Sequence, residues 1–320
     1  MRCKSFPDSF VDSMKVLRSD VLGFCMGIRR AVEIARAATA QASASLPDTS
    51  AQTSAPGKVY SLGPLIHNPR VLAELKAEGL EILEEPDDLQ GASVIIRAHG
   101  ISPQLEQAVR DRGGRIIDAT CPRVKKNQLL ARDFEAAGVR LFIAGEAGHA
   151  EIAGIAGYAP SSIIIGSAEE AELAARNLHE LGTDAKTALI AQTTIDEQKY
   201  FLIGQAIQKN FPGLEIIHTI CPATTERQNS LRQLLEKVDA LVIAGGRDSA
   251  NTRGLALIAD SHGTPYVLAE SAADIPADFF AYDTVGLCAG ASTPDSAVNE
   301  IELALGAHGD QIVHSLKCIL

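Results

Sequence analysis

"RIIDATCPRVKKN" (115–127) and "EIIHTICPATTERQN" (215–229) are near copies of one another, and they decide the fold. In each, a β-branched run ends in Cys-Pro, and an apolar pattern of helical period follows. Proline suits the first position of a helix because its fixed φ is already helical. We therefore predict that Cys121 and Cys221, which are 100 residues apart, each stand between a strand and the start of a helix.

A third copy lies near the N-terminus. "SDVLGFCMGIRRAVEIARAA" (19–38) also brings a short run to a cysteine, Cys25, which precedes Cys121 by 96 residues, and continues with helical periodicity. Repeats of this length are whole small domains rather than solenoid units. Equivalent units around an axis would bring the three thiols to a common centre. The dipole and free N–H groups of a helix start also stabilise a thiolate, the form that binds metal.

Short apolar runs alternate with helix-period segments along the chain. The runs are "VIIRAHG" (94–100), "RIIDATC" (115–121), "RLFIAGEAG" (140–148), "SIIIGS" (162–167), "ALIAQTT" (188–194), "EIIHTIC" (215–221), "ALVIAGG" (240–246) and "TVGLCAG" (284–290). This alternation predicts an α/β fold with parallel sheets. We expect three small α/β domains at 15–120, 121–220 and 221–320, each carrying one of the three cysteines.

Composition and charge narrow the class of partner. The 320 residues are 46% hydrophobic, enough for a substantial core, and the formal net charge is −11. Nucleic acids and anionic membranes recruit clustered Lys and Arg, so we expect neither as a partner and favour a small molecule. No apolar run approaches the roughly 18 residues of a membrane span, and the N-terminal segment lacks the apolar core of a signal peptide. The expected location is the cytoplasm.

Cysteines in that compartment stay reduced, so a cluster of them suggests a metal site. Structural zinc usually takes four ligands in close Cys-x-x-Cys pairs, and this chain has no such pair. Three widely spaced cysteines fit a 4Fe-4S cluster with three protein-ligated irons and one iron open to substrate. Ordinary buried core thiols are the alternative. That alternative is favoured for Cys3, Cys288 and Cys318, two of which lie near the termini and one within an apolar run.

Polar side chains follow the ends of several expected strands, where ligands bind in open α/β sheets. They are His99, His149, Glu151, Thr193, Ser249, Asn251 and Ser292. Neutral donors and N–H groups at helix starts can hold a phosphate or diphosphate without a lysine-rich loop. Taken singly, each of these residues also fits a core, loop or capping role. The remaining histidines, apart from His67, are interpreted as ordinary loop or core residues.

The motifs together resemble one family along residues 16 to 305. They are "GFCMGI" around Cys25, "LGPLIHN" around His67, "RAHG" around His99, "DATCP" around Cys121, "GHAEI" around His149 and Glu151, "AQTT" around Thr193, "CPATTERQ" around Cys221, "DSAN" around Ser249 and Asn251, and "AGASTPD" around Ser292. This combination is similar to the LytB, or IspH, family of 4-hydroxy-3-methylbut-2-enyl diphosphate reductases, iron–sulfur oxidoreductases that perform the last step of the non-mevalonate isoprenoid pathway.

The resemblance implies a trefoil-like, pseudo-threefold fold around a central 4Fe-4S cluster held by Cys25, Cys121 and Cys221. It implies a diphosphate-binding ring formed by His67, His99, His149, Ser249, Asn251 and Ser292. Glu151 and Thr193, with His149 beside them, would orient the substrate hydroxyl and relay protons. The implied electron donor is a ferredoxin or flavodoxin. Ala250 departs from the family's frequent second serine, which removes one expected phosphate contact.

Two other iron–sulfur functions are alternatives, another enzyme and a sensor. Quinolinate synthase also joins three domains and three cysteines around a cluster, but "AHG", "GHAEI" and "AGASTPD" count against it. A non-catalytic iron–sulfur sensor would need a module for nucleic acid or a partner protein, and the acidic chain shows no basic helix-turn-helix pattern.

Overall fold

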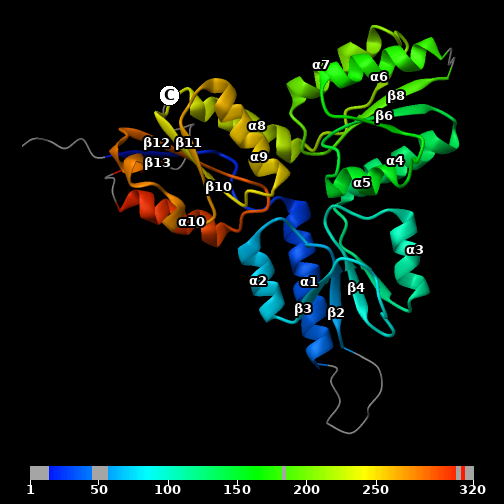
Figure 1. The fold of residues 1–320 in the computed structure, drawn as a ribbon. Helices are drawn as coiled ribbons and strands as arrows, with labels where there is room; N and C mark the ends of the chain where they lie inside the picture. The colour runs from blue at the N-terminus through cyan, green and yellow to red at the C-terminus, as the bar shows by residue number, and fades with distance from the viewer. Residues whose placement is uncertain (1–13, 45–56, 182–184, 308–310, 314–320) are drawn as a thin grey trace, which may run out of the picture.

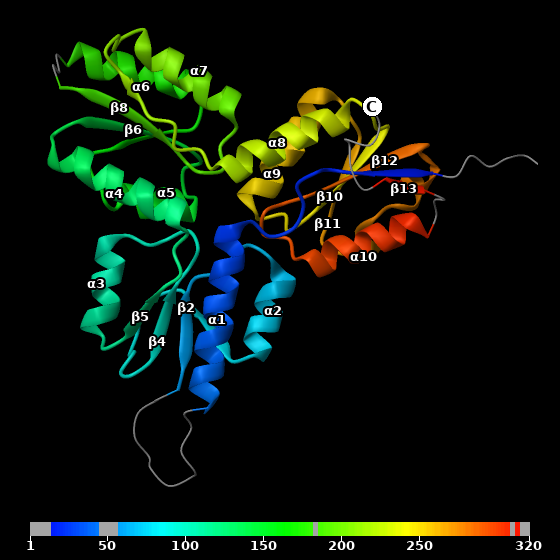
Figure 2. The ribbon, with the colours of Figure 1, turned by 180° about the vertical axis from the view of Figure 1, so that it is seen from behind.

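The computed structural model describes residues 14–44, 57–181, 185–307 and 311–313. Three parallel sheets, each covered by helices, form three lobes around a centre, as the two opposite views of Figures 1 and 2 show. The prediction of an α/β fold with parallel sheets in a trefoil-like arrangement is confirmed. Strands such as β8 and β10 are buried along their whole length, as expected where helices cover both faces of a parallel sheet.

The first sheet has the strand order β3-β2-β4-β5. Its strands are β2 (Val59–Leu62), β3 (Leu80–Leu83), β4 (Ser93–Ile96) and β5 (Arg115–Asp118). Its helices are α1 (Met26–Ala44), α2 (Pro69–Ala77) and α3 (Pro103–Asp111). Side chains of α1, including Ala31, Val32 and Ala35, pack with Val59 and Ile95 in one core cluster. The helix that follows Cys25 therefore belongs to this unit.

The second sheet repeats the same order with later strands, β7-β6-β8-β9. They are β6 (Arg140–Ala144), β7 (Ile163–Ile165), β8 (Thr187–Ala191) and β9 (Glu215–Ile216). The helices are α4 (Pro122–Ala136), α5 (Ala150–Ala156), α6 (Ala168–Glu180) and α7 (Glu197–Gln208). Leu130 and Phe134 of α4 pack against the core around Ile143, which confirms the predicted apolar face after Cys121.

The third sheet has the order β11-β10-β12-β1-β13. Its strands are β1 (Lys15–Arg18), β10 (Ala240–Ala244), β11 (Tyr266–Ala269), β12 (Thr284–Ala289) and β13 (Gln311–Val313). Its helices are α8 (Pro222–Leu235), α9 (Ala250–His262) and α10 (Asp295–Gly306), with 3₁₀ turns at Ala272–Asp274 and Ala277–Ala281. Leu231, Leu234 and Leu235 of α8 are buried together, as their spacing predicts.

Strand β1 departs from the predicted division of the chain. It was assigned to the domain at 15–120, but it pairs in parallel with β12 and β13 of the third sheet. Its residues Val16 and Leu17 are buried in the cores of that unit. The first sheet ends along the chain with β5 at Asp118, and the second with β9 at Ile216. The N-terminal strand thus closes the third unit, while the helix after it opens the first.

Of the three cysteines expected to be ordinary thiols, the structure describes only Cys288. Cys288 is buried in β12 and packs in the core of the third unit. Cys3 and Cys318 lie outside the described residues, as do His308, His314 and the segment 45–56.

Candidate functional site

The three units bring their cysteines to the centre by the same backbone contact. The N–H of Cys121 donates to Ala98 O at 3.0 Å, that of Cys221 to Thr193 O at 3.0 Å, and that of Cys25 to Ala291 O at 3.1 Å. Each acceptor is the second residue beyond a central strand, β4, β8 or β12. Strands β5, β9 and β1 lie beside those strands and lead to the cysteines, so strand pairing brings each cysteine to the end of a central strand.

Each cysteine also stands at the start of a helix. Cys121 and Cys221 are the N-caps of α4 and α8, and Pro122 and Pro222 take the first helical position, as predicted. Cys25 directly precedes α1 and accepts its first backbone bond from Arg29 N at 3.0 Å. The three sulfurs therefore face the positive ends of three helix dipoles.

One cavity of about 90 Å³ lies at this centre. Its wall includes every predicted thiol and every predicted polar side chain: Cys25, Cys121, Cys221, His67, His99, His149, Glu151, Thr193, Ser249, Asn251 and Ser292. Residues that span most of the chain thus contribute to a single chamber. The sequence indicated these residues one by one, and the fold gathers all of them.

The three thiols have the chemistry of a soft sulfur ligand set for a metal centre. None is in a disulfide, and a Cβ built on Gly27 would lie 2.5 Å from Cys121 Sγ, so only glycine lets α1 approach this sulfur. Burial raises the pKa of the Cys121 thiol, and the nearby Cys25 and Cys221 raise it further, while the N–H groups of Arg123 and Val124 oppose the shift. A cationic metal centre beside these sulfurs would favour the thiolate form.

Glu151 and Thr193 form a closed pair on the wall. Glu151 is 1% exposed; its Oε1 accepts from Thr193 N at 2.7 Å and its Oε2 from Thr193 Oγ1 at 2.7 Å. Burial raises the pKa of Glu151 to about 7, and the two bonds from Thr193 only partly offset it. Near neutral pH this carboxyl can therefore exchange a proton with a group in the cavity.

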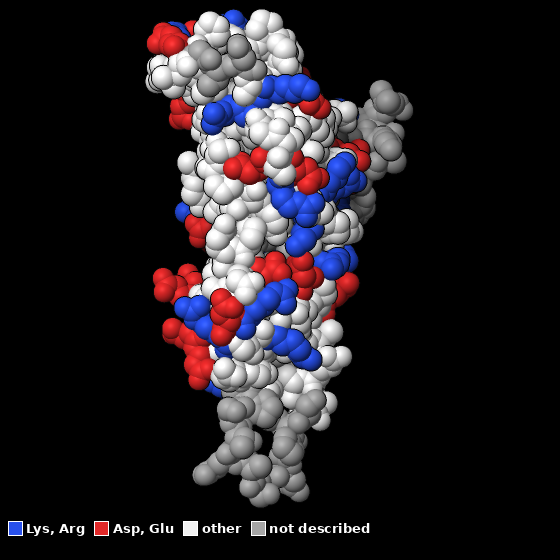
Figure 3. All heavy atoms as spheres, turned by 90° about the vertical axis from the view of Figure 1, so that its right-hand side faces the viewer, with Lys and Arg blue, Asp and Glu red and all other residues white. Residues whose placement is uncertain are grey.

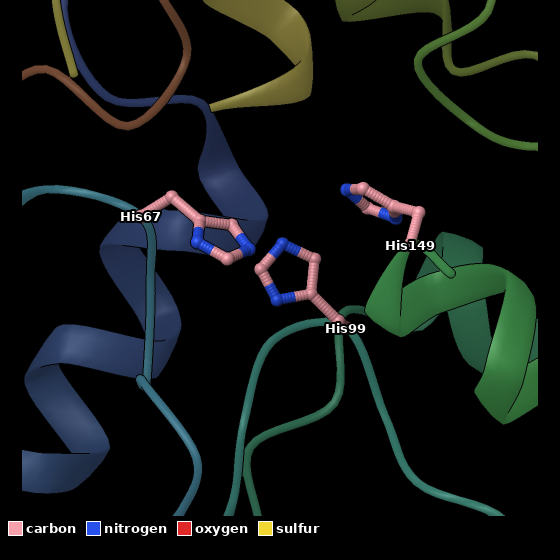
Figure 4. A group of neighbouring side chains, drawn as sticks. All are labelled: His67, His99 and His149. Carbon is pink, nitrogen blue, oxygen red and sulfur yellow. The ribbon is translucent and has the colours of Figure 1, made fainter. Parts of the chain in front are cut away.

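His67, His99 and His149 form a cluster of neutral imidazoles, whose rings lie near one another in Figure 4. The ring centroids of His67 and His99 are 4.8 Å apart, and those of His99 and His149 are 5.4 Å apart. Burial lowers the pKa of all three, that of His149 to about 4. The nearby Arg97 lowers all three further, and His67 also lowers the pKa of His99 and His149. All three are uncharged at neutral pH in the free protein.

The tautomer of His149 shows which kind of ligand suits this cluster. One nitrogen from each of the three rings lies within 4.8 Å of the other two, a spacing compatible with a metal ion. However, His149 Nδ1 accepts from Glu151 N at 3.2 Å, so the ring proton is on Nε2. Nε2 is buried, without a partner among the described residues. An N–H that points into a cavity favours an anion over a cation.

The third unit completes the wall with hydroxyls and an amide. Ser249 is the N-cap of α9, and Asn251 Oδ1 accepts from Ala291 N at 2.9 Å, which leaves the amide NH₂ to act as a donor. Ser292 Oγ donates to His67 O at 3.1 Å and so links the third unit to the first. The start of α9 adds free backbone N–H groups, which suit phosphate oxygens.

The site residues occupy equivalent positions in the three units. His67, His149 and Ser249 are each the fifth residue beyond β2, β6 or β10. His99 and Ser292 are each the third residue beyond β4 or β12. The corresponding position after β8 is Thr194, which lines the cavity but was missed from the sequence. Counting from the strand ends would have found it.

Two further polar residues that line the cavity were missed from the sequence, Arg123 and Thr224. Thr224 lies three residues after Cys221 on α8 and therefore faces the same side of the helix, a relation visible in the sequence. Arg123 is exposed at the start of α4, and helical periodicity alone does not distinguish it from any surface arginine.

The outer surface carries both signs of charge. Figure 3 shows Lys and Arg side chains interspersed with Asp and Glu on one face. None of the helices formed by the described residues is long and apolar enough to cross a bilayer.

Comparison with known proteins gives consistent matches. A family model described as LytB protein matches residues 16–306. The chain is 39% identical to the 4-hydroxy-3-methylbut-2-enyl diphosphate reductase of Treponema denticola, over 91% of this chain and 99% of that protein. It is also 39% identical to the protein of the same name from Solidesulfovibrio magneticus, over 92% and 100% of the two chains.

Solved structures agree with these matches. The E-1-hydroxy-2-methyl-but-2-enyl-4-diphosphate reductase of Plasmodium falciparum has a TM-score of 0.81 at 25% identity and covers 95% of this chain, with 92% of its own. A second structure, of (E)-4-hydroxy-3-methyl-but-2-enyl diphosphate reductase, has a TM-score of 0.63 at 31% identity and covers 92% and 99%. Because the family model and these relatives match nearly the whole length, the chain belongs to the LytB protein family.

Proposed function

We propose that this protein reduces 4-hydroxy-3-methylbut-2-enyl diphosphate to isopentenyl diphosphate and dimethylallyl diphosphate, the last step of the non-mevalonate isoprenoid pathway. One observation carries the proposal: three thiols, a protonatable Glu151–Thr193 pair and an anion-favouring histidine cluster line the same cavity. Reductive removal of a hydroxyl from an allylic diphosphate needs a redox centre, a proton donor and a diphosphate site. The names of the relatives agree with this reaction.

The proposed cofactor is a 4Fe-4S cluster ligated by Cys25, Cys121 and Cys221, with one iron left without a protein ligand. Support comes from the three free thiols on one wall and from the absence of a fourth cysteine among the residues that line the described cavity. When bound, such a cluster supplies single electrons and a Lewis-acidic iron.

Glu151 is the proposed proton donor to the leaving oxygen. The reaction consumes two electrons and two protons: the C–O bond breaks, one proton leaves with the oxygen as water, and the second is added to the allyl carbon skeleton. A carboxyl with a pKa of about 7 is half protonated at neutral pH, which suits a general acid. Thr193 would orient the substrate hydroxyl, because its own hydroxyl contacts Glu151 at 2.7 Å.

The diphosphate would bind between the three units. Buried donors there include His149 Nε2, which lacks a partner among the described residues, and the amide of Asn251. His67, His99, Ser249 and Ser292 complete the proposed ring. A bound anion would favour the imidazolium forms, so the histidines can gain charge only when the substrate arrives.

An external protein must deliver the electrons, and we propose a ferredoxin or flavodoxin as the donor. The proposed location remains the cytoplasm, a reducing compartment in which three unpaired thiols persist. The LytB family match argues against quinolinate synthase, and a cavity with a proton donor argues for an enzyme rather than a sensor.

Anaerobic turnover of 4-hydroxy-3-methylbut-2-enyl diphosphate by the iron–sulfur-reconstituted protein tests the proposal. Oxidation of a reduced viologen dye would be followed, and the products identified by mass spectrometry. We expect dye oxidation with formation of both five-carbon diphosphates. A protein that holds iron and sulfide but leaves the substrate intact would refute the reaction while retaining the cofactor.

A further inference from the structure

Arg227 is a buried cation without a carboxylate partner in the part of the chain that the structure describes. It lies on α8, six residues after Cys221, and is only 2% exposed. Among the described residues its bonded partners are backbone carbonyls, and its Nε has no partner. Buried arginines are normally paired because an isolated charge in a low-dielectric interior costs several kcal/mol. The charge of Arg227 therefore requires an explanation.

The carbonyl partners of Arg227 lie around Cys25. Its Nη1 donates to Ala289 O at 2.6 Å and to Val21 O at 3.1 Å, and its Nη2 donates to Gly23 O at 2.9 Å. Val21 and Gly23 belong to the loop that leads from β1 to Cys25. Ala289 ends β12, two residues before the carbonyl that accepts the Cys25 N–H. The guanidinium thus fixes this cysteine's loop to the third sheet.

The anionic candidates near the guanidinium are two cysteines. Both Cys25 and Cys288 act to raise the pKa of Arg227, whereas its burial lowers it. Burial raises the pKa of the Cys288 thiol to about 12, so Cys288 is neutral at physiological pH. The remaining counter-charge is the metal centre that Cys25 would help to hold.

We propose that Arg227 is the buried counter-charge of the iron–sulfur centre, a positioning residue whose fixed positive charge raises the centre's reduction potential. This inference rests on the proposed function, because it requires a cluster at Cys25, Cys121 and Cys221. Reduction adds one negative charge to the centre, and a nearby cation stabilises the reduced form more than the oxidised form. Removing the cation therefore lowers the potential and makes the centre harder to reduce.

The test compares Arg227→Lys with Arg227→Gln. Both variants lose the planar fork that holds three carbonyls, but only lysine retains a positive charge. Arg232→Gln is the matched control, because it removes a half-buried, ion-paired arginine from the same helix. The midpoint potential of the reconstituted protein would be measured by anaerobic titration followed by electron paramagnetic resonance.

We expect the Arg227→Gln centre to be at least tenfold harder to reduce, a shift of 59 mV or more for one electron. The Arg227→Lys and Arg232→Gln centres should stay closer to the wild-type potential. Equal shifts in both Arg227 variants would overturn the charge role and leave only loop positioning. An unchanged potential in both would overturn the inference altogether.

The stability of the cluster-free chain gives a second, independent readout. Without the anionic centre the buried charge is uncompensated, so cluster-free Arg227→Gln should unfold at the same temperature as Arg227→Lys or higher. With the cluster bound, that order should reverse. A wild-type chain that binds no cluster would overturn this inference together with the proposed cofactor. Wild-type cluster binding and turnover with an unchanged potential in Arg227→Gln would overturn only the role of Arg227.

Discussion

The second and third units build the same contact with different chemistry. Glu151 and Asn251 are each the seventh residue beyond β6 or β10, and each accepts the N–H of the second residue beyond the neighbouring strand. In the second unit this acceptor is a carboxyl with a pKa of about 7; in the third it is an amide that cannot ionise. The two units therefore share this contact, and of the two acceptors only Glu151 can exchange a proton.

The cysteines, by contrast, are the same in all three units. A compact inorganic cluster offers similar iron atoms in several directions, so equal ligands suit it. An extended substrate with a hydroxyl at one end and a diphosphate at the other requires different neighbours along its length. The same residue, cysteine, at all three thiol positions would suit such a cluster. The different side chains at the equivalent polar positions would suit such a substrate.

The largest effect is expected when one of the three equivalent cysteines is replaced. Cys121→Ser should lose most bound iron and all measurable turnover, because a hard hydroxyl is a poor ligand for an iron–sulfur cluster. Cys288→Ala is the matched control, since it removes a core thiol and should cost about 1 kcal/mol of stability while it retains the cluster. Iron and sulfide analysis of both proteins tests this. Full iron content in Cys121→Ser would contradict the proposed ligand set.

The next effect comes from giving the second unit the amide chemistry of the third. Glu151→Gln keeps the acceptor for Thr193 N but removes the exchangeable proton. Turnover should fall by about 100-fold or more, the usual contribution of a general acid, with iron content unchanged. Glu172→Gln, on the exposed face of α6, is the control. Near-normal turnover in Glu151→Gln would remove this residue from the proton relay.

A smaller effect, on KM, should distinguish the histidines of the proposed diphosphate ring from its serines. His149→Ala should raise KM about tenfold or more, because a donor that can become charged is lost, whereas Ser249→Ala should raise it only a few-fold. His149→Asn is the control for helix capping, since asparagine still caps α5 but lacks the ring Nε2. Steady-state kinetics with the diphosphate substrate measures all three. An unchanged KM in His149→Ala would exclude His149 from the diphosphate site.

The smallest effect is on the stability of the cluster-free chain. The folded-state pKa of Glu151, about 7, lies above its ordinary value of 4.5, so the protonated carboxyl favours folding. This contribution is complete below pH 4.5 and is lost as the pH rises through 7. The difference in unfolding free energy between wild type and Glu151→Gln should therefore change by up to about 3 kcal/mol over this window. Urea unfolding at pH 5 and pH 8 measures it; a constant difference would mean that Glu151 titrates normally.

Much of the local structure could be predicted from the sequence because it depends on short-range chemistry. Cys-Pro after a β-branched run marks a strand that leads to a helix, and both Pro122 and Pro222 begin helices. Strands β1 and β13 could not be assigned to a sheet in this way. Four-residue and three-residue strands carry little periodicity, and β1 pairs with β12 and β13, both of which lie far from it along the chain.

The sequence by itself determined the α/β class, the repeated cysteine unit and the identity of most of the polar residues that line the cavity, because strand ends and helix starts are set by neighbouring residues. Only the tertiary structure decided which residues meet, including the pairing of Glu151 with Thr193 and the burial of Arg227 beside the Cys25 loop. Those contacts join residues 42 and 204 positions apart. Their energies depend on burial and on the charges of neighbours from other units, which no local pattern records.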